Sequence, residues 1–156
     1  MKRRFITAVI ALAVTAVTLF FASCNRACRL VVYDTETNEV YKTFEISEGC
    51  EFSVEFIHSV NKSPVVDVFV IKDGNIVADR TVYSAFGAGV QTFVEDGQTL
   101  EYDEHGNMVV SGFDIVFPEV KYIVGTVSDH LLRIGGESIS LTELCGKNAH
   151  IAFKLG

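Results

Sequence analysis

The amino-acid sequence predicts a single all-β domain of short strands, arranged as an antiparallel β-sandwich or a barrel-like fold, after an N-terminal signal or anchor segment. Two observations predict this class. Turn-forming residues recur about every eight to twelve positions, and apolar and polar residues alternate between them. No long segment has the helical period of apolar residues, and 156 residues suffice for one domain with a buried core.

The N-terminal segment has the features of a secretory signal. Met1–Arg4 is basic, residues 5–21 carry no charge, and small residues precede Cys24. This ending is similar to a bacterial lipoprotein signal, so we favour lipidation of Cys24. An uncleaved membrane helix and a plain secreted form stay as alternatives.

We expect residues 1–23 to be this signal peptide or anchor, residues 24–28 a tether, and residues 29–156 the β domain. The domain is then extracytoplasmic, in the periplasm or at the cell surface, and anchored to a bacterial membrane by lipid or helix. Without residues 1–23 the chain loses three basic residues, so its formal net charge changes from −7 to −10. Phosphate backbones repel such an acidic body, which argues against nucleic-acid binding.

Strand signals run through the rest of the chain. We expect nine to twelve strands and one helical turn, at 142–145. The strand segments are 29–33, 40–46, 50–60, 65–71, 76–83, 91–95, 100–103, 108–110, 113–117, 120–127, 131–134 and 149–155, and residues 137–141 lead into the helical turn.

The stretch 52–82 is predicted to form two consecutive hairpins, and it contains the main candidate site. A four-residue loop at 61–64 places His58 opposite Asp67. A two-residue turn at Asp73-Gly74 places Asp67 opposite Arg80. The three side chains then form one row on an otherwise apolar face. A one-residue bulge at Gly74 would send Arg80 to the other face.

This row has two interpretations. In the first, Asp67 orients His58 and Arg80 recognises a carboxylate or another anion. In the second, the three groups are a buried polar network that satisfies its own charges and sets the strand register. Gly87 and Gly89 either let backbone amides approach a ligand or mark a corner of the fold.

Other chemistry has little support in the sequence. Cys50 and Cys145 are candidates for a disulfide, with the connectivity left open. Hydrolysis would recruit Ser59 or Ser84, but Ser59 faces away from His58 on an alternating strand and Ser84 lacks a nucleophile elbow. The histidines lack metal-ligand spacing, so we expect no metal and no cofactor.

Three segments together resemble a bacterial family catalogued as domain of unknown function 1850. They are Phe56-Ile57-His58-Ser59-Val60, then residues 63–69 (Ser-Pro-Val-Val-Asp-Val-Phe), then residues 83–89 (Tyr-Ser-Ala-Phe-Gly-Ala-Gly). The family pattern has glutamate where this chain has Asn61 and Asp67, so one of two carboxylates is kept. The resemblance implies an accessory role beside a solute-uptake transporter of the TAXI type of TRAP systems.

The sequence therefore favours a membrane-tethered extracytoplasmic binding domain without enzymatic activity. Its expected partner is a small anionic solute, or a membrane or solute-binding subunit of a transporter. One alternative is a structural or assembly factor of the cell envelope without a ligand site. A third is a hydrolase with an unrecognised dyad.

Overall fold

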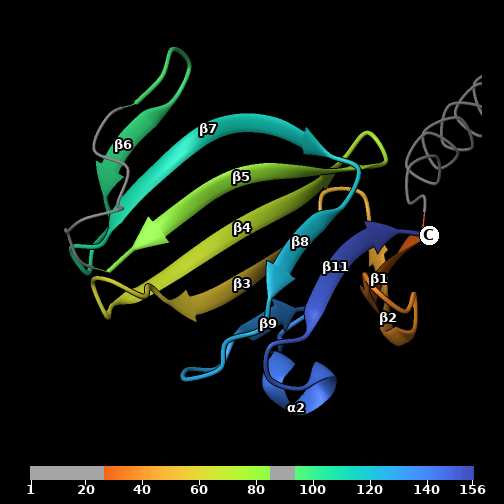
Figure 1. The fold of residues 1–156 in the computed structure, drawn as a ribbon. Helices are drawn as coiled ribbons and strands as arrows, with labels where there is room; N and C mark the ends of the chain where they lie inside the picture. Colours follow the sequence, from red (N-terminus) through yellow and green to blue (C-terminus); the bar gives the residue numbers. More distant parts are fainter. Residues whose placement is uncertain (1–26, 85–93) are drawn as a thin grey trace, which may run out of the picture.

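A computed structural model describes residues 27–84 and 94–156, which form two antiparallel β-sheets and one short helix (Figure 1). The smaller sheet has the strand order β2-β1-β11-β8. Its strands are β1 (Ala27–Asp34), β2 (Val40–Ser47), β8 (Val120–Ile123) and β11 (His150–Leu155). β1 includes Ala27 and Cys28, the last two residues of the segment that we expected to be a tether.

The larger sheet has seven strands in the order β10-β9-β3-β4-β5-β7-β6. Its strands are β3 (Glu51–Ile57), β4 (Pro64–Lys72), β5 (Asn75–Tyr83), β6 (Thr99–Tyr102), β7 (Met108–Phe117), β9 (Leu131–Ile134) and β10 (Glu137–Ser140). The all-β sandwich predicted from the sequence is thus confirmed.

The two sheets enclose a core built from alternate residues of their strands. Phe52 of β3 stacks on Phe69 of β4 with ring centroids 5.1 Å apart, and it contacts Phe153 of β11 at 5.6 Å. Leu30 and Val54 are fully buried on facing sheets. On each layer the core residues come from the inward-facing positions of the strands.

The structure confirms the two hairpins and the helical turn that were predicted from turn-forming residues. β1 pairs with β2, and β4 pairs with β5 through Ile71 and Ile76. Asp73 and Gly74 both have positive φ, 53° and 70°, as a type I′ hairpin turn requires. The predicted helical turn is α2 (Leu141–Cys145), where the Ser140 hydroxyl accepts the backbone N–H of Glu143.

Other element predictions need correction. The two short strands expected at 108–110 and 113–117 are the single strand β7, in which Gly112 and Asp114 have positive φ. The strand expected at 120–127 ends at Ile123. The strand expected at 91–95 falls largely on residues outside the described part.

The connection between the sheets positions the site. Only two residues separate β7 in the large sheet from β8 in the small sheet. In Figure 1, β5, β7 and β6 reach beyond the four-stranded layer, so part of their inner face has no strand over it. β8 is the edge strand that borders this uncovered area.

The described cysteines Cys28, Cys50 and Cys145 are free thiols. The Cys50–Cys145 disulfide considered from the sequence is therefore not formed. Within residues 27–84 and 94–156, no helix has the length and apolar character needed to cross a membrane.

Candidate functional site

The predicted row of His58, Asp67 and Arg80 does not form. On β3 and β4, the partner of Asp67 is Val54 rather than His58. The loop that joins these strands spans residues 58–63, whereas we predicted residues 61–64. The His58 N–H closes this loop by donating to the Ser63 carbonyl at 2.9 Å. His58 lies four residues beyond Val54, which is about 13 Å along a strand.

His58 instead organises the loop between β3 and β4. Its Nδ1 accepts the backbone N–H groups of Val60 and Asn61, both at 3.3 Å. The Lys62 N–H donates to the His58 carbonyl at 2.9 Å, and Lys62 has a φ of 55°. The imidazole of His58 thus accepts two backbone N–H groups of the loop that would otherwise bond to carbonyl oxygens.

A β-bulge moves Arg80 to the other face of the sheet. Ala78 pairs with Phe69, and Arg80 pairs with Val68, so Asp79 is the extra residue. We expected that a bulge at Gly74 would move Arg80 to the other face. The bulge that has this effect lies at Asp79 instead. Thr81 takes the position opposite Asp67 that we expected for Arg80.

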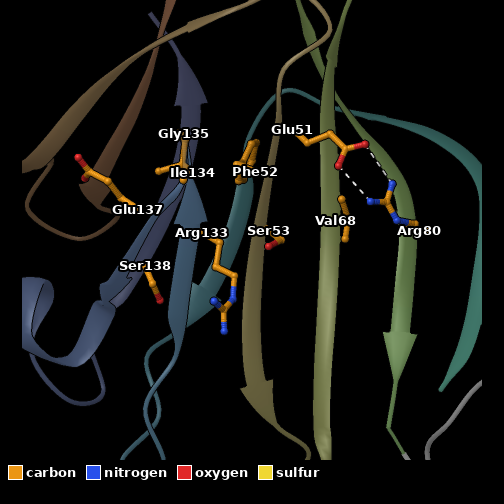
Figure 2. Close-up of a pocket in the computed structure, with 11 residues that line it drawn as sticks. Glu51, Phe52, Ser53, Val68, Arg80, Arg133, Ile134, Gly135, Glu137 and Ser138 are labelled. Atoms are coloured by element: carbon orange, nitrogen blue, oxygen red, sulfur yellow. Dashed lines mark hydrogen bonds and ion pairs between the residues drawn. The ribbon is translucent and has the colours of Figure 1, made fainter. Parts of the chain in front are cut away.

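On this outer face, Arg80 lines a shallow pocket of about 360 Å³ (Figure 2). The side chain of Glu51 reaches across β4 and accepts two hydrogen bonds from the Arg80 guanidinium, at 3.1 and 3.0 Å. Asp79 accepts a further bond from Arg80. The bonds from Arg80 lower the pKa of Glu51, and the bond to Glu51 raises the pKa of Arg80.

Among its described lining residues, the outer pocket has no unpaired positive charge. Its second guanidinium, Arg133, donates to Glu55 at 3.1 and 2.7 Å. Glu137 also lines the pocket and adds another carboxylate. A small anion would have to displace Glu51 or Glu55, so the arrangement does not favour the anion recognition expected of Arg80.

Asp67 lies on the inner face, and among the described residues its carboxylate accepts hydrogen bonds from side-chain hydroxyls only. Its Oδ1 accepts from Thr81 Oγ1 at 2.9 Å, and its Oδ2 accepts from the Tyr122 hydroxyl at 2.8 Å. None of the ion pairs found in the described part of the chain includes Asp67. Burial, together with the nearby Asp67 charge, raises the pKa of Tyr122 well above its usual value.

Asp67 is at the junction of two adjoining cavities, of about 200 and 470 Å³, which we call the inner groove. Both cavities are lined by Asp67, Phe69 and Phe117. The first is also lined by Val68, Ala78, Arg80, Thr81, Phe113 and Ile115, and the second by Glu119, Val120, Lys121 and Tyr122. The groove occupies the uncovered area beside β8.

The rim charges of the inner groove compensate one another. Lys121 Nζ is 2.6 Å from Glu119 Oε1, and the Tyr33 hydroxyl donates to the same carboxylate. The bond from Lys121 is the main reason why the pKa of Glu119 is lowered. No cation of the described residues pairs with Asp67, which therefore lies without a counter-ion on a floor of apolar and aromatic groups.

A second polar group lies behind Tyr122. The His130 ring stacks on Phe56 with centroids 5.4 Å apart and meets the edge of Tyr122 at 6.2 Å. Its Nδ1 accepts the Gly125 N–H at 3.0 Å. Burial lowers the pKa of His130, and the charge of Asp129 opposes this effect.

Sequence reasoning missed Thr81, Tyr122 and Phe117. No local signal marked the bulge at Asp79 that brings Thr81 to Asp67. Tyr122 belongs to the other sheet, so hairpin pairing could not place it.

Three proposed site residues, Gly87, Gly89 and Cys24, lie outside the described residues. Their roles in binding and lipidation stay predictions. Within the described part, no group of three or more histidine, cysteine, aspartate or glutamate side chains is arranged to hold a metal ion.

The fold and the groove define an all-β sandwich with a partly buried carboxylate in an apolar inner groove. The chain belongs to the family described as domain of unknown function (DUF1850), whose model matches residues 52–141. This match covers β3 to the start of α2, and so it includes Asp67, Thr81 and Tyr122. No curated protein and no solved structure matches the chain.

Proposed function

We propose that the chain is a membrane-tethered extracytoplasmic binding domain, with the inner groove as its ligand site. The observation that supports this proposal is Asp67. Partial burial of a carboxylate without a cation among the described residues costs free energy, and two hydroxyl hydrogen bonds offset only part of that cost. A ligand that completes the contacts of Asp67 accounts for its position at the junction of two cavities.

The bonds of His58 and His130 support binding over hydrolysis. Nδ1 of His58 and Nδ1 of His130 both accept backbone N–H groups. Those bonds position loops, whereas a nucleophile dyad requires a histidine nitrogen that faces a serine or cysteine side chain.

We further propose that the domain serves a solute-uptake transporter of the TAXI type of TRAP systems. The family resemblance and the N-terminal signal support this finer role. The alternative is an envelope assembly factor that uses no ligand.

Co-purification tests the transporter role. The full chain is co-expressed with the membrane and solute-binding subunits of such a transporter, and complexes are isolated from detergent-solubilised membranes. We expect the chain to be retained with the transporter and the Cys24→Ser chain to leave the membrane fraction. A chain that stays in the membrane without the transporter would instead favour the assembly factor.

Native mass spectrometry of the full chain tests the ligand site independently of the partner. We expect a small molecule to be bound to the native chain and to the Asp73→Asn control, and to be lost from Asp67→Asn. Asp73 is a suitable control because asparagine before glycine also favours the type I′ turn. Equal occupancy of all three proteins would exclude Asp67 from the site.

A further inference from the structure

The chemistry of the inner groove also indicates the class of ligand, an inference that rests on the proposed function of this site. We infer that the groove binds a protonated amine carried on a small apolar or aromatic group. This reverses the charge expected from the sequence, because the expected anion depended on Arg80 facing the same side as Asp67.

The first argument is charge complementarity. Each Asp67 oxygen accepts one hydroxyl hydrogen bond, at 2.9 and 2.8 Å, and a carboxylate oxygen has room for another donor. Both described cations that line the groove are already paired, Lys121 with Glu119 at 2.6 Å and Arg80 with Glu51 and Asp79. An ammonium group supplies both the missing charge and the missing donors.

The second argument is the aromatic lining. Phe69 and Phe117 line both cavities, and their rings meet edge to face with centroids 6.4 Å apart. Phe113 and Tyr122 extend this lining on either side. Aromatic faces attract cations and also bury apolar groups, so they suit both parts of such a ligand.

An anion is disfavoured at this place for the same reasons. It would meet the Asp67 carboxylate at close range and would lose its hydration against aromatic rings. The Arg80 guanidinium could not compensate, because it is held by Glu51 and Asp79 on the outer face.

Three probes of matched shape test the ligand class: benzylamine, benzyl alcohol and benzoate. The sequence contains no tryptophan, so Phe117→Trp in the full chain gives a single reporter inside the groove. Fluorescence titration near pH 7 gives the dissociation constant of each probe. We expect benzylamine to bind about tenfold more tightly than benzyl alcohol, with benzoate weakest.

Asp67→Asn in the same background should remove the preference for the amine, so that benzylamine and benzyl alcohol bind with similar affinity. Asp73→Asn, far from the groove at a turn, should keep the preference. Equal binding of all three probes, or tighter binding of benzoate, would overturn the amine assignment while the groove remained a binding site. If none of the probes changed the fluorescence, both the ligand class and the groove as a ligand site would be rejected.

Discussion

His130 shows how the surroundings of one side chain set its chemistry. A proton on Nδ1 would break the hydrogen bond from Gly125, and the Phe56 ring keeps water away from one face of the imidazole. Both effects favour the neutral form, and burial accordingly lowers the pKa of His130. The unfolded chain has no such preference.

We therefore expect acidification to destabilise the protein in the range where unfolded histidine titrates. The unfolded state binds more protons than the folded state once the pH falls below about 6.5, the usual histidine value. The free energy of unfolding should decrease from there down to the lowered pKa of His130. Urea denaturation at a series of pH values measures this dependence.

His130→Asn should flatten the profile, because the asparagine oxygen can accept the Gly125 N–H without titrating. His105→Asn is the matched control, since the His105 side chain is 75% exposed. An unchanged slope in His130→Asn would show that another group causes the dependence.

The connection between β8 and β9 depends on a close backbone approach at Gly125. A Cβ atom there would lie 2.0 Å from the Ser128 carbonyl oxygen and 3.1 Å from His130 Nδ1. Glycine is required at this position for space, since its φ is not in the positive region. The connection in turn positions His130 behind Tyr122.

We expect Gly125→Ala to displace this connection and to reduce the free energy of unfolding by roughly 1–3 kcal/mol. The His130 resonances in NMR titrations should shift toward the pKa of a free histidine. Gly74→Ala is the comparison, because its cost comes from a φ of 70° with no atom near the added Cβ. A His130 titration that was the same in both variants would contradict the role assigned to Gly125.

The whole molecule is held together by the contact between its two sheets. Phe52 of the large sheet and Phe153 of the small sheet are both fully buried, and their rings are 5.6 Å apart. Removing either ring leaves a cavity between the layers as well as lost apolar burial.

Phe52→Ala should reduce the free energy of unfolding by about 3–5 kcal/mol, and Phe153→Ala by a similar amount. Because the two rings touch, the double variant should cost less than the sum of the single ones. Chemical denaturation of all three variants measures this. Val127→Ala, at a side chain that is 97% exposed, should stay within about 0.5 kcal/mol of the native chain. A loss below about 1 kcal/mol in Phe52→Ala would contradict a core shared by the sheets.

Much of the architecture could be predicted from local pattern. Alternation along residues 50–57 and the Asp73-Gly74 turn are properties of a few neighbouring residues, so the strands and the β4–β5 hairpin were placed correctly from Lys72 as far as Phe69. The predicted site was wrong because it required the strand register to be extrapolated beyond the residues next to each turn. Two extra loop residues after Ile57 and one bulge residue at Asp79 were enough to separate the three predicted side chains.

Side-chain period alone accounts for the all-β class and for an inward carboxylate at Asp67, because both follow from spacing within one strand. The partners of that carboxylate depend on the packing of distant segments. Thr81 reaches Asp67 through a bulge, and Tyr122 reaches it from the opposite sheet, 55 positions away in the chain. A shift of one residue in strand register reverses which face a side chain occupies, and such a shift separates Arg80 from Asp67. The negative charge of the groove could therefore be recognised only in the tertiary structure.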